Sequence, residues 1–108
     1  MPMTKAKSIW MNGKLVAWDD ARIHILTHAM HYASSVFEGI RAYDTPRGPA
    51  IFRLEEHIDR LMFSARVYRM EKEMAFTRDQ VRDACLTVVA ANGLKDCYIR
   101  PLVYRGYE

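Results

Sequence analysis

Nine residues, SVFEGIRAY from Ser35 to Tyr43, constrain the fold more than any other part of the sequence. Their character alternates as in a β-strand, where successive side chains point to opposite faces of the sheet. The pattern predicts one face made of Phe37, Gly39, Arg41 and Tyr43. It predicts an opposite face made of Val36, Glu38, Ile40 and Ala42. The fold must therefore contain a sheet that uses this strand.

Gly39 is the unusual member of this strand. A glycine inside a strand weakens it, and often marks a place where another group approaches the backbone closely. One interpretation is a core strand with a glycine bulge. The other is a wall of a binding site, in which the aromatic Phe37 stands beside exposed backbone. The pattern alone leaves both open.

Further strands are expected on both sides of this one. Residues 9–18 predict a β-hairpin around Asn12-Gly13, the strongest short hairpin signal. After an irregular stretch, residues 28–32 predict a single helical turn. The turn formers of residues 44–49 predict a second hairpin, with residues 50–53 as its return strand. Residues 97–105 predict a last strand, in which Pro101 requires an edge position or a bulge because it cannot donate a hydrogen bond.

Two helices are expected between these strands. In the first, over residues 54–70, apolar residues recur at helical spacing: Leu54, Ile58, Leu61, Met62, Ala65 and Tyr68. Phe63 and Val67 lie opposite that stripe, on the flank of Arg60, so we expect this helix to be covered on both sides, partly by something outside the chain. His57 and Arg60 share a flank because they are three residues apart.

The second helix, over residues 77–92, has clear ends. Thr77 and Gln80 form a capping box, and Gly93 follows where a left-handed cap is expected. These elements predict an α+β fold: an antiparallel sheet built from hairpins, with two packed helices.

Composition narrows the function classes. The 108 residues suit one domain, and half of them are hydrophobic. The net charge of +3 comes from dispersed arginines, which does not favour nucleic-acid binding. Without a long apolar run we expect neither a membrane span nor a secretory signal. Two cysteines without metal-like spacing fit a reduced, cytoplasmic protein. The clustered His24, His28 and His31 are expected to make local hydrogen bonds rather than a metal site.

Tyr98 and Arg100 are predicted to face the same way on the last strand. A phenol beside a guanidinium suits a carboxylate ligand, because arginine presents a planar fork that matches two oxygens. The alternative is an exposed polar face of an edge strand. Both interpretations remain open from the residues alone.

Three runs together resemble a known family: HYASSVFEGIRAYD (31–44), FRLEEHIDRL (52–61) and YIRPL (98–102). Their order and spacing resemble those of branched-chain amino acid aminotransferases, which are fold-type IV enzymes that use pyridoxal 5′-phosphate. The resemblance extends from Trp10 to Arg105. The HxxRL element supports only the superfamily, whereas SVFEGIR with YIRPL favours this branch over D-amino acid aminotransferases or aminodeoxychorismate lyases.

The resemblance implies roles for six residues. Arg60 matches the arginine that binds the cofactor phosphate. Phe37 and Gly39 match positions that line the substrate side-chain pocket and the cofactor face. Tyr98 and Arg100 match residues near the cofactor and near an acidic substrate side chain.

Tyr32 matches an aromatic residue that reaches into the neighbouring subunit's pocket, which requires at least a dimer. No family role is implied for Glu38. A charge among apolar neighbours needs a partner, so we expect an arginine beside it, with Arg53 as the candidate.

The resemblance further implies that residues 1–108 form the N-terminal small domain of a two-domain enzyme. Such an enzyme moves the amino group between leucine, isoleucine or valine and 2-oxoglutarate. Its partners would be amino acids and 2-oxo acids, its own C-terminal domain, and further copies of itself. The catalytic lysine and the acid that pairs with the pyridine nitrogen are expected beyond residue 108, so this part alone should be inactive. A stand-alone binding or interaction module is the alternative from another class.

Overall fold

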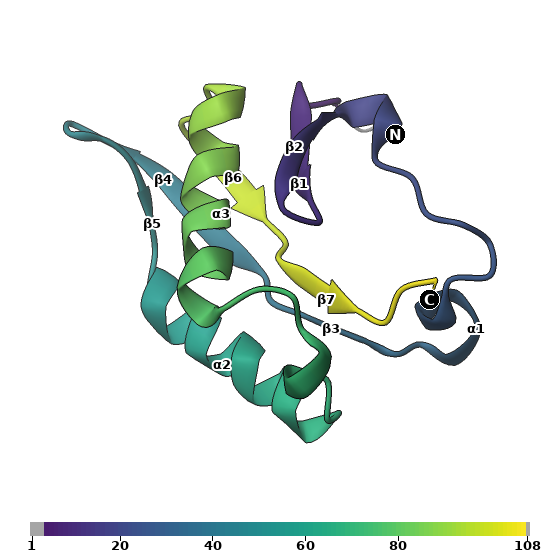
Figure 1. The fold of residues 1–108 in the computed structure, drawn as a ribbon. Helices are drawn as coiled ribbons and strands as arrows, with labels where there is room; N and C mark the ends of the chain where they lie inside the picture. Colours follow the sequence, from purple (N-terminus) through teal and green to yellow (C-terminus); the bar gives the residue numbers. More distant parts are fainter. Residues whose placement is uncertain (1–3, 108) are drawn as a thin grey trace.

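The computed structural model describes residues 4–107, and their α+β arrangement confirms the expected fold class (Figure 1). The strands are β1 (Ser8–Met11), β2 (Lys14–Ala17), β3 (Ser35–Phe37), β4 (Ile40–Thr45), β5 (Gly48–Ile51), β6 (Cys97–Ile99) and β7 (Leu102–Tyr104). The α-helices are α1 (His28–Tyr32), α2 (Leu54–Val67) and α3 (Arg78–Asn92). Short 3₁₀ turns cover Trp18–Asp20 and Glu71–Glu73. Throughout residues 4–107, each helix is too short or too polar to span a lipid bilayer.

The first hairpin forms as predicted. β1 and β2 pair from Ser8 with Ala17 to Met11 with Lys14. Asn12 and Gly13 take φ values of 51° and 98°, the left-handed region that a tight two-residue turn requires. The hairpin is fixed to α3 by the buried Asn92, whose Oδ1 accepts hydrogen bonds from the Lys7 and Ser8 backbone N–H groups at 2.8 and 2.9 Å.

The strand predicted over residues 35–43 is interrupted. β3 pairs with β7, and β4 pairs with β6, both antiparallel and with one continuous register. That register places Glu38 opposite Pro101 and Gly39 opposite Arg100, with no added residue, so Gly39 does not form a bulge. Pro101 has no N–H to donate, although its carbonyl still accepts from the Glu38 N–H at 3.1 Å. The predicted single strands over residues 35–43 and 97–105 are therefore each two short strands.

The second hairpin has a tighter turn than predicted, and its return strand covers residues 48–51 instead of 50–53. β4 continues through Asp44 and Thr45, and β5 begins at Gly48, so only Pro46 and Arg47 form the turn. Gly48 accommodates it with a φ of 104°. Turn-forming residue types alone do not show that Asp44 and Thr45 also pair across the hairpin.

Helices α2 and α3 cover one face of β4 and β6 (Figure 1). The main core lies between this pair of helices and this pair of strands. Ile40 and Ala42 from β4 meet Ile58 from α2 and Val89 from α3. The α3 ends follow the prediction, because Thr77 and Gln80 exchange both capping-box hydrogen bonds and Gly93 takes a φ of 63°. A second, smaller cluster holds Leu61 and Ala65 against Val36 and Met70.

Helix α2 is shorter than predicted. It ends at Val67, because Arg69 adopts a left-handed φ of 58° and turns the chain back. Met70 is buried by this turn, whereas Tyr68, which we expected in the apolar stripe, is exposed. Phe63 and Val67 are exposed, so the expected cover over this flank stays a prediction.

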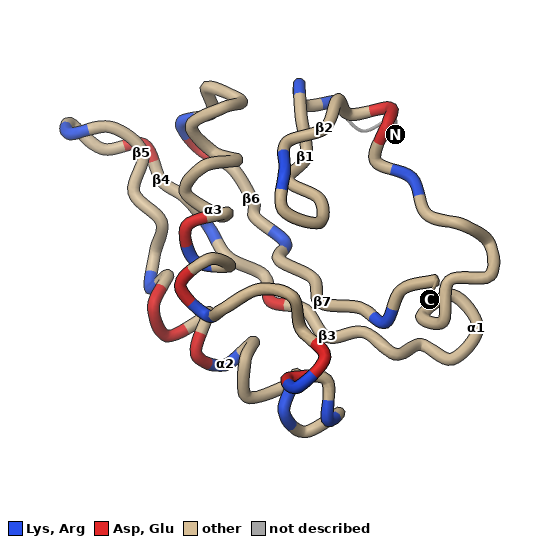
Figure 2. Tube along the Cα trace, viewed as in Figure 1, with Lys and Arg blue, Asp and Glu red and all other residues tan. Residues whose placement is uncertain are grey.

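Acidic and basic residues both occur along α2 and α3 (Figure 2). Arg78 binds Asp59 and Glu55 of α2 at 2.8 and 3.0 Å, and Arg82 binds Glu55 at 2.6 Å. These arginines lower the pKa of Glu55. By contrast, α1 carries no Lys, Arg, Asp or Glu (Figure 2).

Candidate functional site

Four of the six candidate residues lie where the two interrupted strands face each other. Phe37 and Gly39 come from the segment that holds β3 and β4, here called the β3–β4 chain (residues 35–45). Tyr98 and Arg100 come from the segment that holds β6 and β7, the β6–β7 chain (residues 97–104). Burial alternates along residues 36–43 as predicted, with Val36, Glu38, Ile40 and Ala42 buried and the intervening residues exposed. Side chains of the exposed set therefore share the face away from α2 and α3.

Phe37, Gly39, Tyr98 and Arg100 form the exposed group, and the Arg100 guanidinium contacts two of the other side chains. It lies over the Phe37 ring at 4.3 Å from the ring centroid. Its Nη2 and Nε donate to the Tyr98 hydroxyl at 2.7 and 3.3 Å. Tyr98 and Arg100 thus face the same way, as predicted. Stacking and one shared acceptor hold the guanidinium in place, while its Nη1 makes no hydrogen bond within residues 4–107 and could bind an anionic oxygen.

Gly39 is required by the Tyr98 side chain. A Cβ atom at position 39 would lie 2.4 Å from the Tyr98 hydroxyl and 3.1 Å from two of its ring carbons. No other side chain can occupy this place without moving the phenol. The close approach that a strand glycine indicates is therefore made by Tyr98.

Glu38 forms the second group, on the face toward α2. Its side chain is only 6% exposed. Arg60 Nε donates to both carboxylate oxygens at 3.0 and 2.9 Å, and Arg60 Nη2 donates to Oε1 at 2.7 Å. His57 Nδ1 lies 2.8 Å from Oε1. The hydrogen bond from Arg60 is the main reason that the pKa of Glu38 is lowered, and Glu38 in turn raises the pKa of Arg60.

The predicted arginine partner of Glu38 exists, but it is Arg60. Arg53 was the wrong candidate, because it precedes α2 in a left-handed conformation and binds Glu56 at 3.3 Å. His57 and Arg60 share a flank as the helical spacing predicted, and the structure shows why that matters. No sequence pattern indicated that both side chains would meet at one carboxylate.

The donor set of Arg60 fits a phosphate group. Its side chain is 67% exposed, although Glu38 occupies Nε and one hydrogen of Nη2. Within the described residues, Nη1 has no hydrogen-bond partner, so it remains available on the outer side of the guanidinium. A permanently charged planar fork suits a phosphate oxygen pair.

Tyr32 lies apart from both groups. It ends α1 with 72% of its surface exposed, and its ring stacks near His28 at 4.6 Å between centroids. Helix α1 lies beside the last described residues, because the His28 and Ala29 N–H groups donate to Gly106 and Arg105 carbonyls.

The histidine cluster makes local hydrogen bonds, as predicted. His24 Nδ1 accepts from the Leu26 N–H, His28 Nδ1 pairs with the Ser34 hydroxyl, and His31 Nε2 donates to the Ile25 carbonyl.

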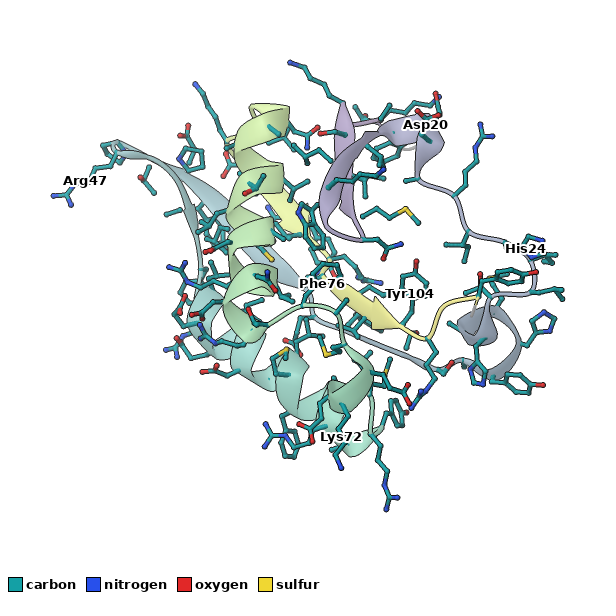
Figure 3. All side chains as sticks on the ribbon, viewed as in Figure 1. Asp20, His24, Arg47, Lys72, Phe76 and Tyr104 are labelled. Atoms are coloured by element: carbon teal, nitrogen blue, oxygen red, sulfur yellow. The ribbon has the colours of Figure 1, made fainter. Side chains whose placement is uncertain are left out.

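A hollow of about 720 Å³ lies elsewhere, between the first hairpin and β7. Figure 3 shows Phe76, Tyr104 and His24, which belong to its lining. Its lining includes none of the six candidate residues. Arg22 and Arg105 also line the hollow, but because none of the six candidate residues does, we place the candidate site on the Arg100 and Arg60 groups.

Known branched-chain-amino-acid aminotransferases are similar to nearly the whole of this chain. The chain is 47% identical over 106 residues to the branched-chain-amino-acid aminotransferase of Salmonella typhimurium, covering 98% of this chain and 34% of that protein. It is 50% identical over 100 residues to the Pseudomonas aeruginosa enzyme of the same name, covering 93% of this chain and 32% of that protein. The chain thus spans about a third of the length of the relatives it matches.

Solved structures show the same fold. A branched-chain amino acid aminotransferase from T.th., complexed with N-(5′-phosphopyridoxyl)-L-glutamate, superposes with a TM-score of 0.92 at 50% identity, covering 98% of this chain and 35% of that one. The Escherichia coli branched-chain enzyme gives a TM-score of 0.89 at 47% identity, covering 94% and 33%. The resemblance inferred from the three sequence runs is confirmed.

The sequence profile of the amino-transferase class IV family matches residues 35–108. That range includes the β3–β4 and β6–β7 chains, helix α2, and all candidate residues except Tyr32. This chain belongs to the amino-transferase class IV family.

Proposed function

We propose that this chain is the N-terminal small domain of a branched-chain-amino-acid transaminase that uses pyridoxal 5′-phosphate. The full protein would move amino groups between leucine, isoleucine or valine and 2-oxoglutarate. The observation that carries the proposal is the position of the Arg100 guanidinium. The Phe37 ring and the Tyr98 hydroxyl hold it, and its Nη1 donors remain available for a ligand. High identity to branched-chain aminotransferases supports the same reaction.

In this proposal the exposed group binds substrate. The Phe37 ring offers an apolar surface to an aliphatic side chain, and Arg100 offers a cation to the side-chain carboxylate of glutamate or 2-oxoglutarate. One pocket would thereby accept both kinds of substrate. Gly39 keeps room for the Tyr98 hydroxyl, which remains able to donate a hydrogen bond after accepting from Arg100.

Arg60 would bind the cofactor phosphate through the outer side of its guanidinium. When bound, pyridoxal phosphate supplies the electron sink that amino-group transfer requires. The residues of this chain bind and orient; the lysine and the acid that act on the cofactor would lie beyond residue 108. This chain alone would therefore be inactive.

Tyr32 would contribute to a pocket of a neighbouring subunit. Its 72% exposure and the neighbouring exposed Ile25, Leu26 and Met30 support this, because clustered exposed apolar residues commonly mark protein contacts. We therefore propose a homo-oligomer of at least two subunits. Analytical ultracentrifugation of the full protein tests this: a monomer at assay concentrations would contradict it. The free cysteines Cys85 and Cys97 fit a proposed cytoplasmic location.

The substrate role is tested by Arg100→Ala in the full-length enzyme. We expect the KM for 2-oxoglutarate to rise about tenfold or more, since a hydrogen bond to a charged group is worth about 1.5–3 kcal/mol. Turnover of the aliphatic substrate should fall less. Unchanged use of glutamate and 2-oxoglutarate by this variant would contradict the substrate assignment, which gives Arg100 the side-chain carboxylate.

The phosphate role is tested by Arg60→Ala. After dialysis, this variant should retain less pyridoxal phosphate than the wild type, as read from the absorbance of the bound cofactor. Arg66→Ala is the matched control, because Arg66 is also an exposed arginine of α2 but pairs with Glu71 instead of Glu38. Equal retention by both variants would contradict the phosphate role.

A further inference from the structure

The buried carboxylate of Glu38 has no role in the function proposed above. It lies in the chain between Phe37 and Gly39 and faces the opposite way, toward α2. With 6% of its side chain exposed, it is the one acidic side chain of residues 4–107 that is buried. A buried carboxylate is costly unless it is paired and hydrogen-bonded. Its partners therefore show what keeps it there.

Those partners are both on α2, one helical turn apart. Arg60 approaches in a fork, with Nε at 2.9–3.0 Å and Nη2 at 2.7 Å. His57 approaches the same oxygen, Oε1, at 2.8 Å through Nδ1. An ionised carboxylate can only accept, so His57 Nδ1 carries the hydrogen. The carboxylate is thereby fixed from two directions.

The ion pair with Glu38 determines the orientation of the Arg60 guanidinium. The edge that carries Nε is turned inward to Glu38, so Nη1 and one hydrogen of Nη2 point away from the carboxylate. An unpaired arginine on an exposed helix surface samples many rotamers, and binding would have to immobilise it. Arg60 is exposed yet held at its inner edge, so this cost is reduced before any ligand arrives.

We propose that Glu38 is a positioning residue that orients Arg60 for a phosphate group, and that His57 keeps the Glu38 carboxylate in place. This inference rests on the proposed phosphate role of Arg60. It assigns a purpose to a carboxylate that stands close to where an anion would bind. Orientation of the guanidinium outweighs the repulsion between the two anions, because Glu38 and the ligand occupy opposite sides of the same cation.

The test compares two probes on the full-length apoenzyme: pyridoxal 5′-phosphate and pyridoxal, which lacks the phosphate. The ratio of their dissociation constants isolates the phosphate contribution. For Glu38→Gln we expect this ratio to change about tenfold in disfavour of the phosphate form, the loss typical of one charge-assisted hydrogen bond. Glu55→Gln is the control, because Glu55 also pairs with arginines but does not touch Arg60.

A double-mutant cycle with Arg60→Ala shows whether Glu38 acts through Arg60. In the Arg60→Ala background, Glu38→Gln should leave the ratio unchanged. Glu38→Asp is the second variant if Glu38→Gln does not fold. It keeps the charge on a shorter side chain, and should also lower phosphate preference because it cannot reach both partners.

The outcomes separate the two proposals. If Arg60→Ala changes the ratio and Glu38→Gln does not, the positioning role is wrong and the phosphate role stands. If Arg60→Ala leaves the ratio unchanged, the phosphate role itself fails. Equal weakening of both probes by Glu38→Gln would show a merely structural role, and tighter phosphate binding would show that repulsion dominates; either result overturns the inference.

Discussion

Replacing Gly39 with alanine tests how the exposed group is built. The new Cβ would lie 2.4 Å from the Tyr98 hydroxyl, where ordinary contact begins at 3.4 Å. The hydroxyl must therefore retreat by about 1 Å. The backbone itself is not strained by the change, because Gly39 is not among the residues with positive φ.

The displaced hydroxyl is the acceptor for Arg100. A retreat of about 1 Å lengthens the 2.7 Å bond from Nη2 beyond hydrogen-bond distance. Arg100 then keeps its contact with the Phe37 ring but loses the hydrogen bond that fixes its direction. We expect the KM for 2-oxoglutarate to rise about tenfold, which corresponds to ~1.4 kcal/mol.

Stability should change little in the same variant. Losing one exposed hydrogen bond costs about 0.5–1.5 kcal/mol. Replacing a glycine by alanine at a compatible backbone position recovers about 0.4–1 kcal/mol by restricting the unfolded chain. The two effects nearly cancel, so the unfolding midpoint in urea should stay close to that of the wild type while substrate binding weakens.

Steady-state kinetics and urea unfolding of the full-length enzyme measure both quantities. Gly106→Ala is the matched control, since a Cβ there meets no atom within 4 Å. In a Tyr98→Phe background the clash with the hydroxyl is gone, and Gly39→Ala should cost much less than in the wild type. An unchanged KM for 2-oxoglutarate in Gly39→Ala, or equal losses in both backgrounds, would refute the reasoning.

Three further predictions concern stability. Ile58→Ala should lower the free energy of unfolding by about 2–5 kcal/mol, because Ile58 of α2 is fully buried in the core with β4 and α3. Denaturant titration measures this loss, and a value below ~1 kcal/mol would contradict the assigned core. Thr77→Ala should cost about 0.5–2 kcal/mol through the lost cap, whereas Thr87→Ala in the exposed middle of α3 should cost nothing measurable by the same titration. The pKa of Glu38 is lowered by folding, so its pairing stabilises the protein above pH 4.5 and this stability is lost as the pH falls from there through the lowered value. Urea midpoints measured across that range should fall less steeply for Glu38→Gln than for the wild type, and parallel profiles would contradict this.

Local patterns were sufficient for most of the elements. The Asn12-Gly13 hairpin, the capping box of α3 and its terminal glycine depend on residues close in the sequence, so their chemistry can be read directly. The alternation over residues 36–43 also predicted correctly which side chains are buried. It could do so because a strand has only two faces, and only one of them meets the helices.

The ends of the helices and strands were harder to predict from the sequence, because they depend on residues that are distant in the sequence. The break between β3 and β4 results from the facing Pro101, more than sixty residues later, as the residue numbers show. The tighter turn of the second hairpin results from pairing of Asp44 and Thr45 with Pro49 and Gly48 of β5. The end of α2 follows from a left-handed Arg69, which no residue type in the pattern indicated.

The sequence by itself determined what stands on each face of the first strand, and it supplied the resemblance on which the site residues rest. Tertiary structure alone decided which groups meet. It replaced Arg53 with Arg60 as the partner of Glu38, because α2 carries Arg60 and His57 over the buried face while Arg53 stays outside with Glu56. It also explains why position 39 is a glycine. Only the pairing of the β3–β4 chain with the β6–β7 chain brings the Tyr98 hydroxyl close to the backbone of Gly39. A pattern fixes the direction of a side chain, whereas the identity of its neighbour depends on how separate elements pack.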